Sequence, residues 1–384
     1  MTEVVITGGA RTAIGRFQGA YKDVPAYKLG ATAIAAALER AGVEPGEVES
    51  VVMGCVAEVG PDAYNARRCA LEAGIPVSVP AYNVNRLCSS GLQAIWSGVK
   101  DIKVGDYEIV VAGGDENMSM QPFFDYSARS GAALGDRKLV DGTLSLVTDP
   151  WGNYPMGETA EKVAERFGIT RERQDRYALR SQELAAAAIA GGLFERQIVA
   201  VDDFAQDEHP RMTTLEQLAT LKTVFRKDGT VTAGNASGIN DGGAAVILES
   251  AGHAAKAGRT PLARFVGATV TALEPEIMGF APAAAVRKLM AQTGLTLDQI
   301  DVIELNEAFA AQVLAVIDEL GIAEDDPRLN PEGGAIALGH PVGATGALLT
   351  VKAIDRLQRT GGRYGLVTMC IGGGQGMAAV FEKI

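Results

Sequence analysis

The hydrophobic pattern of this chain repeats itself. Residues 36–54 combine an apolar helical face, a glycine at position 42, a short acidic connection and a continuous apolar stretch. Residues 286–306 follow the same plan, and Gly294 stands 252 positions after Gly42. Each unit predicts a helix, a glycine that ends it and a buried strand. The repeat indicates two structurally similar halves.

The same offset relates Cys88 to His340 and Gly91 to Gly343. Both regions predict a helix, over residues 88–102 and 340–357, and each helix leads to an apolar strand, over residues 107–114 and 364–374. Cys88 and His340 therefore occupy equivalent helix starts. If the halves pack about a pseudo-twofold axis, the two side chains face each other across it.

The pattern changes between the halves. Aromatic and glycine-rich loops over residues 121–136 precede a helical pattern over 159–192, and strand-like residues return at 244–250. We therefore expect an inserted loop domain. The resulting division is an N-terminal half of residues 1–116 plus 241–262, a loop domain of residues 117–240, and a C-terminal half of residues 263–384.

Composition narrows the class of protein. The 46 glycines favour the tight strand-to-helix turns of layered α/β folds. A net charge of −12 without a basic block argues against nucleic-acid binding, and no apolar stretch is long enough to span a membrane. Residues 1–17 predict a strand and turn instead of a signal peptide. The four cysteines have neither disulfide-framework nor zinc spacing, so we expect a reduced, metal-free, cytoplasmic protein.

Two residues at helix starts are candidates for chemistry. Cys88 lies between an apolar strand and a helix, where the helix dipole and free N–H groups favour a nucleophilic thiolate. The alternative is a small buried core residue. His340 lies among small residues and suits proton transfer near neutral pH. Its alternative role is to cap the helix start.

Two further candidates follow strands. Cys370 precedes the glycines of CIGGGQG, which could direct backbone N–H groups into an oxyanion hole. A simple tight turn or a phosphate-binding loop are the alternatives, although no Lys-Ser/Thr follows to support the latter. Asn306 comes directly after a buried strand, a usual ligand position in α/β folds, and the Glu307 carboxylate could hold the local network together.

Taken together, the segments NRLCSSGLQA, TVTAGNASGINDGGAAV, NEAFA, GGAIALGHPVGATG and CIGGGQG resemble the thiolase family. They occur in the family's order and cover nearly the whole chain. The resemblance implies the α/β thiolase fold, in which two similar halves stack as five layers (α, β, α, β, α) and carry a loop domain. It also implies reversible cleavage of 3-ketoacyl-CoA, or condensation of acyl-CoAs, with ping-pong kinetics.

The resemblance assigns a role to each candidate. Cys88 would be the acylated nucleophile, and His340 would take its proton. Cys370 would act as acid and base at the substrate α-carbon. Asn306 would position a water that forms one oxyanion site with His340, and the backbone N–H groups of Cys88 and Gly372 would form the other.

The resemblance also implies binding sites for coenzyme A and acyl-CoA as substrates, with no resident cofactor. It suggests a homodimer or homotetramer and a role in fatty acid metabolism. Arg211 would contact the nucleotide end of CoA. Residues implied at the CoA tunnel and beside the pantetheine are Met156, Phe225, Ala233, Ser237 and Phe309.

The chain departs from the family pattern in two places. Pro155 stands where many acetoacetyl-CoA-forming thiolases have His, and GGDENMS places Asp115 and Asn117 in a motif usually written GGMESMS. A ketoacyl-synthase-type condensing enzyme is the nearest alternative, but it would lack NEAFA and the second cysteine. A non-catalytic CoA- or lipid-binding relative is the other, and the intact set of candidates argues against it.

Overall fold

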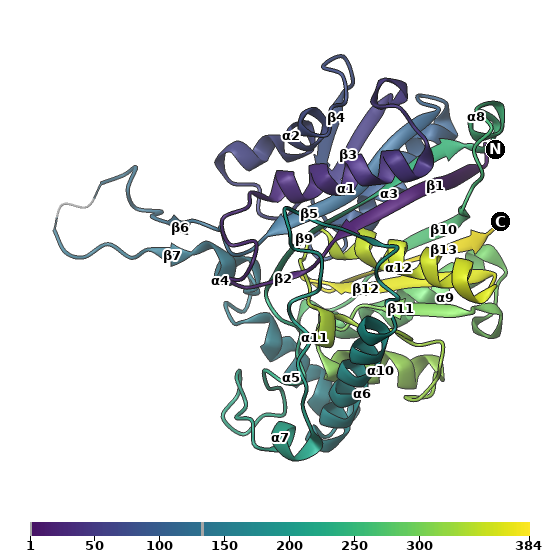
Figure 1. Ribbon diagram of the computed structural model, residues 1–384. Helices are drawn as coiled ribbons and strands as arrows, with labels where there is room; N and C mark the ends of the chain where they lie inside the picture. The colour runs from purple at the N-terminus through teal and green to yellow at the C-terminus, as the bar shows by residue number, and fades with distance from the viewer. Residues whose placement is uncertain (1, 132–133) are drawn as a thin grey trace.

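The computed structural model describes residues 2–131 and 134–384 (Figure 1). Its main strands form one continuous mixed β sheet with two halves, an N-terminal sheet and a C-terminal sheet that are joined edge to edge. They join where β1 (Val4–Thr12) pairs antiparallel with β10 (Ala263–Ala272). Outward from β1 the order is β9 (Asn240–Ser250), β5 (Ile109–Asn117), β3 (Ser50–Gly54) and β4 (Ala81–Val84). Outward from β10 it is β13 (Gln375–Lys383), β12 (Tyr364–Ile371) and β11 (Val302–Leu305).

Helices cover both faces of each sheet. The central layer consists of α3 (Ser90–Val104) and α12 (Thr345–Thr360), which pack on both sheets. The outer layers are α1 (Ala26–Ala41) with α2 (Asn65–Glu72), and α9 (Ala281–Thr293) with α10 (Ala310–Leu320). The predicted five-layered α/β fold is therefore confirmed.

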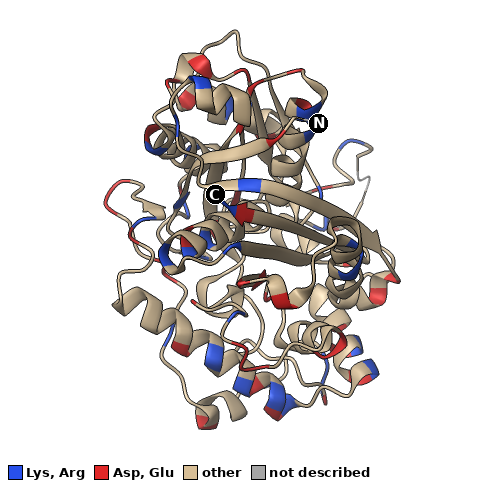
Figure 2. Cartoon of the chain, turned by 90° about the vertical axis from the view of Figure 1, so that its right-hand side faces the viewer, with Lys and Arg blue, Asp and Glu red and all other residues tan. Residues whose placement is uncertain are grey.

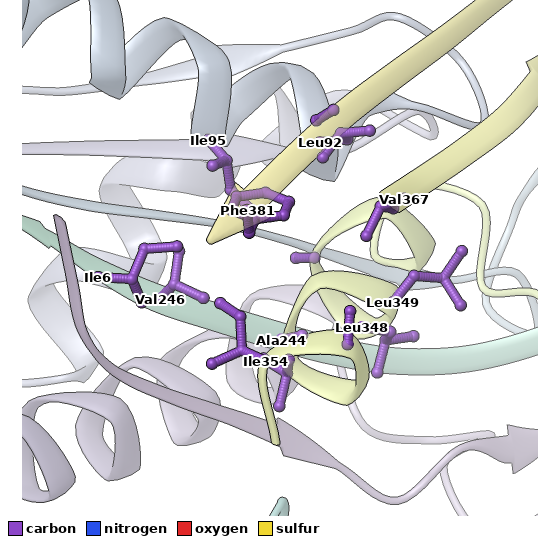
Figure 3. Packing of buried hydrophobic residues seen from close by; sticks show 14 of the residues in the cluster. Ile6, Leu92, Ile95, Ala244, Val246, Leu348, Leu349, Ile354, Val367 and Phe381 are labelled. Atoms are coloured by element: carbon purple, nitrogen blue, oxygen red, sulfur yellow. The ribbon is translucent and has the colours of Figure 1, made fainter. Parts of the chain in front are cut away.

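The largest hydrophobic core lies in this central layer. Leu92 and Ile95 of α3 and Leu348 of α12 lie close to Val246 and Phe381 from the two sheets (Figure 3). All five side chains are buried. Lys, Arg, Asp and Glu residues are instead found mostly along helices and loops (Figure 2). Burial of this apolar surface holds the halves together and fixes where α3 and α12 begin.

The internal repeat predicted from the sequence is confirmed. Helices α1 and α9 both end at a glycine in the left-handed conformation, with φ 64° at Gly42 and 72° at Gly294. Strands β3 and β11 follow, beginning at Ser50 and Val302, which keep the 252-residue offset. A left-handed helix end favours glycine because it lacks a Cβ.

The segment between β5 and β9 is arranged differently from the halves. Strands β6 (Phe123–Phe124) and β7 (Val140–Asp141) pair in an arm that projects from the body (Figure 1). Val163 of α5 (Met156–Phe167) and Tyr177 of α6 (Arg171–Ala190) share a hydrophobic cluster with α10, so these helices pack on the C-terminal half. The proposed boundaries at residues 117 and 240 remain a prediction.

The remaining elements are short or belong to this same segment. None of the helices within residues 2–131 and 134–384 is long and apolar enough to cross a membrane. The elements are β2 (Gly15–Arg16), α4 (Gly142–Leu146), α5 (Met156–Phe167), α6 (Arg171–Ala190), β8 (Ile198–Val199), α7 (Leu215–Ala219), α8 (Ala251–Lys256) and α11 (Ala335–Leu338).

Candidate active site

A cavity of about 490 Å³ brings together residues from both halves and from the segment between them. Cys88, His340, Cys370 and Gly372 all line it. Cys88 lies just before α3 and His340 before α12, whereas Cys370 and Gly372 lie at the end of β12. A concave, largely apolar site with a few convergent polar groups is the usual form of a small-molecule site.

Glycines let the two central helices approach closely beneath this cavity. A Cβ on Gly91 would lie 2.9 Å from the backbone N of Ala347 and 3.0 Å from the carbonyl O of Gly343. A Cβ on Gly346 would collide with the backbone of Leu92. The equivalent positions Gly91 and Gly343 thus meet between the halves, as the repeat predicts.

Cys88 is half-buried and is held at the end of a sharp backbone turn. Leu87, the residue before it, has a φ of 48°, in the left-handed region. Burial raises the pKa of Cys88 to about 11, although the backbone N–H groups of Gly372 and Cys88 itself act in the opposite direction. The local N–H groups favour the thiolate as expected, but loss of hydration outweighs them.

His340 is fixed at both its backbone and its ring. Its backbone N–H donates to Asn240 Oδ1 at 3.0 Å. Its ring Nδ1 lies 2.6 Å from Thr345 Oγ1, and its Nε2 lies 3.5 Å from Asn306 Nδ2. Burial lowers the pKa of His340 to about 4, so the ring is neutral at physiological pH.

Cys370 is fully buried at the end of β12, before a tight glycine turn. Burial raises the pKa of its thiol well above the usual range, and a negative charge on Cys88 would raise it further. Gly373 and Gly374 have φ values of 80° and 82°. The backbone N–H of Gly372, in this turn, lowers the pKa of the Cys88 thiol.

Asn306 and Glu307 lie behind the cavity wall. Asn306 reaches the ring of His340 but does not itself line the cavity. Glu307 is buried and accepts hydrogen bonds from the hydroxyls of Tyr177 at 3.0 Å and Ser181 at 2.7 Å, and from Asn330 Nδ2 at 2.8 Å. This network ties α6 to the strand end that carries Asn306, which agrees with the role expected for Glu307.

Five of the residues expected at the CoA tunnel line the cavity. Phe225 and Phe309 meet edge to face, with ring centroids 6.2 Å apart. Arg211 does not line it, because its guanidinium is exposed and donates to the carbonyl of Ala233. The arginine therefore lies next to the cavity wall on its solvent side. The five lining residues are Met156, Phe225, Ala233, Ser237 and Phe309.

Sequence reasoning missed most of the apolar wall. These side chains come from separate elements, and an isolated valine, leucine or methionine carries no sequence signal that distinguishes a cavity wall from the core. Around Cys88, several of them form one hydrophobic cluster. The missed lining residues include Val56, Met118, Leu144, Leu146, Val147, Val224, Met278 and Val342.

The unusual Asp115 lies in a buried polar cluster near the site. It accepts hydrogen bonds from Asn65 Nδ2 at 2.9 Å and from the Cys69 thiol at 3.2 Å. The neighbouring Glu116 accepts the N–H of Gly343 at 2.9 Å and two N–H groups of the loop after β3. Burial raises the pKa of Asp115 to about 8 and that of Glu116 to about 7. Glu116 thus connects the loop after β3 to the turn that follows His340.

The chain matches two family models that together cover most of its length. The model described as "Thiolase, N-terminal domain" matches residues 4–252, and "Thiolase, C-terminal domain" matches residues 259–383. An acetyl-CoA acetyltransferase of Pseudomonas aeruginosa is 47% identical, with 100% of both chains covered. A beta-ketothiolase of Cupriavidus necator is also 47% identical, covering 100% of this chain and 99% of the relative.

Solved structures agree with the sequence comparisons. The Bacillus anthracis acetyl-CoA acetyltransferase has a TM-score of 0.98 at 44% identity, covering 100% of this chain and 99% of that one. The human mitochondrial 3-ketoacyl-CoA thiolase in complex with CoA has a TM-score of 0.97 at 43% identity, covering 100% and 98%. The fold, the site and the whole-length similarity lead to one conclusion: the chain belongs to the thiolase family and is an acyltransferase with thiolase function.

Proposed function

We propose that this thiolase cleaves 3-ketoacyl-CoA, and in reverse condenses acyl-CoAs, through an acyl thioester on Cys88. The observation that carries the proposal is the convergence of Cys88, His340 and Cys370 on one apolar cavity. Division of acyl transfer into two thioester steps gives ping-pong kinetics.

In the first half-reaction, His340 accepts the thiol proton of Cys88 as the sulfur attacks the 3-keto carbon. The carbon–carbon bond then breaks, and the departing carbanion of acetyl-CoA takes a proton from Cys370. In the second half-reaction, the thiol of free CoA gives its proton to the Cys370 thiolate and attacks the acyl-Cys88 carbonyl, which releases the shortened acyl-CoA. Cys88 recovers the proton held by His340 as it leaves, so both residues return to their starting protonation states.

Negative charge on the reacting oxygens requires fixed donors. The N–H groups of Gly372 and Cys88, both of which lower the pKa of the Cys88 thiol, would form one oxyanion site. Asn306 stands beside His340 Nε2, in position to hold a water for the second site. Removal of one such preorganised donor from an enzyme site lowers kcat by about 10²–10³-fold.

The resting state of this site is uncharged. A Cys88 pKa of about 11 and a His340 pKa of about 4 mean that a preformed thiolate–imidazolium pair is strongly disfavoured at neutral pH. Proton transfer therefore accompanies nucleophilic attack.

The cavity favours an apolar acyl group longer than acetyl. No Lys or Arg occurs among its lining residues, and Leu146, Val147 and Met118 contribute apolar surface close to Cys88. Pro155 also lines it, at the position where a histidine is common in acetoacetyl-CoA-forming relatives. A terminal carboxylate would be buried here without a cation, which is costly. We therefore expect beta-ketoadipyl-CoA to be a poor substrate of this protein. A relative from Acinetobacter baylyi that is 47% identical carries the name beta-ketoadipyl-CoA thiolase, so this substrate gives a useful comparison.

CoA would enter past the aromatic pair. Phe225 and Phe309 would flank the pantetheine, with Met156 and Ser237 on neighbouring walls. Arg211 would meet the nucleotide end from the solvent side. No resident cofactor is needed for these steps, since CoA and acyl-CoA are the reactants.

We also propose a cytoplasmic homo-oligomer, either dimer or tetramer. Its support is the projecting β6–β7 arm, whose Phe123 and Leu139 are 61% and 60% exposed, and the open edge of β4. A role in fatty acid metabolism follows from the proposed substrates. Light scattering of the purified protein tests the assembly, and cell fractionation tests the compartment.

A thiolysis profile tests the proposed function. Unbranched 3-ketoacyl-CoAs of increasing chain length and beta-ketoadipyl-CoA are each mixed with CoA, and loss of the 3-keto substrate is followed. Each buried methylene contributes about 0.8 kcal/mol, so kcat/KM should rise about fourfold per methylene until the cavity is filled. CoA binding without turnover of any substrate would instead favour a non-catalytic relative. A faster rate with beta-ketoadipyl-CoA would overturn the assignment of an apolar acyl group.

A further inference from the structure

The two ring nitrogens of His340 have different neighbours. Nδ1 lies 2.6 Å from the hydroxyl of Thr345, and Nε2 lies 3.5 Å from the amide nitrogen of Asn306. A neutral imidazole carries one proton, and the partner of one nitrogen decides whether the other is a donor or an acceptor. The function of the ring therefore depends on which nitrogen holds the proton.

The surroundings of Thr345 favour a proton on Nδ1. The Thr345 hydroxyl also lies 2.8 Å from the carbonyl of Pro341, one helical turn earlier, and a carbonyl can only accept. Threonine hydroxyls in a helix commonly donate back to this carbonyl. With its single hydrogen used in that bond, Thr345 Oγ1 accepts from Nδ1–H.

The other side of the ring agrees with this assignment. An amide nitrogen is a donor only, so the approach of Asn306 Nδ2 matches a lone pair on Nε2. The backbone of His340 is separately anchored by Asn240. Gly339 has a φ of 106°, and a Cβ added there would collide with the side chain of the same asparagine. Thr345 is thus the contact that sets the ring itself.

We propose that Thr345 is a positioning residue that keeps the proton of neutral His340 on Nδ1. Nε2 then carries no proton and can take the proton of Cys88. This proposal rests on the function proposed above. When the thiol proton reaches Nε2, the ring becomes an imidazolium, and Oγ1 of Thr345 accepts from its Nδ1–H throughout. With the opposite tautomer, Nε2 would already hold a proton and could not act as the base.

The first test reads the tautomer directly. The chain has only three histidines, so selective ¹⁵N labelling and long-range ¹H–¹⁵N spectra give few signals, and His340→Asn assigns those of His340. We expect the protonated-type nitrogen shift at Nδ1 and the unprotonated type at Nε2. The reverse pattern, or averaged shifts, would overturn the proposal even if the enzyme is active.

The second test compares Thr345→Val, which removes the hydroxyl at nearly constant volume, with Thr345→Ser, which keeps it. Acylation of Cys88 is followed by rapid quench with a 3-ketoacyl-CoA. The valine variant should acylate 10–100 times more slowly with unchanged affinity for CoA and an altered pH profile, and its His340 shifts should average between tautomers. The serine variant should stay within threefold of the parent.

The outcomes separate this proposal from the function on which it rests. Equal acylation rates for the valine and serine variants would reject the role of Thr345 while leaving acyl-Cys88 chemistry intact. Equal losses in both variants would indicate a packing role and would also reject it. Absence of any acylation in the parent protein would instead refute the proposed function.

Discussion

Replacement of Gly91 by alanine tests whether the close approach of the central helices sets the geometry of the site. The added Cβ would stand 2.9 Å from the N of Ala347 and 3.0 Å from the O of Gly343. Ordinary contact begins near 3.4 Å, so α3 and α12 must move apart by about 0.5 Å, because backbone atoms cannot rotate away. The movement separates the two helix starts that carry Cys88 and His340.

The expected cost has two parts. Overpacking of this kind destabilises a core by about 1–3 kcal/mol, which for a chain of this length lowers Tm by roughly 1–4 °C. Misplacement of reacting groups by 1 Å can cost about 10²-fold in rate, so half that distance should lower kcat roughly tenfold. KM for CoA should change little, because the five tunnel residues lie on other elements.

The assay combines steady-state thiolysis with differential scanning calorimetry. Gly252→Ala in α8 is the matched control, since a Cβ there meets nothing within 4 Å and alanine favours a helix. That variant should keep full activity and an equal or higher Tm. Normal kcat and Tm for Gly91→Ala would show that this contact does not set the positions of Cys88 and His340.

Three other predictions follow from buried charge and from the cavity rim. Burial raises the pKa values of Asp115, Glu116 and Glu304 to about 8, 7 and 7, so these carboxyls hold protons more tightly when folded. Their contribution to stability is therefore complete below about pH 4 and is lost as pH rises through the folded pKa values of about 7 to 8. Urea unfolding should show roughly 5 kcal/mol less stability at pH 8.5 than at pH 6, and a rise would contradict this. Glu307→Gln puts an amide donor among four donors and should cost about 2–4 kcal/mol in the same unfolding assay, whereas an unchanged midpoint would show that the network is dispensable. Arg211→Ala should raise KM for CoA about two- to fivefold at constant kcat, and an unchanged KM would remove Arg211 from the nucleotide site.

The fold and the main candidates could be predicted because they leave local signals. The 252-residue repeat places Cys88 and His340 at equivalent helix starts, and glycine stops such as Gly42 mark helix ends independently of tertiary structure. In α/β folds, functional side chains also lie commonly at the junctions between strands and helices. The structure brings these residues together as that logic requires.

The protonation state of the site was not predictable from the same signals. The helix start suggested a thiolate at Cys88, but residues distant in sequence, including Met118 and Val342, bury the sulfur and reverse the balance. The cavity walls were missed for a related reason, since apolar residues on separate elements look alike until the chain is folded. The buried polar cluster around Asp115 was also not predictable, because no sequence motif indicates that Asn65 and Cys69 pack beside this carboxyl group.

The proposed reaction depends on Cys88 as the carrier of the acyl group, which the mass of the protein reveals after acyl-CoA is added without free CoA. We expect one added acyl group per chain, located on the peptide that contains Cys88, removed by CoA and absent from Cys88→Ser under acidic quench. Acyl label on Cys370 or any other residue in the parent protein, or full labelling that survives replacement of Cys88, would contradict it.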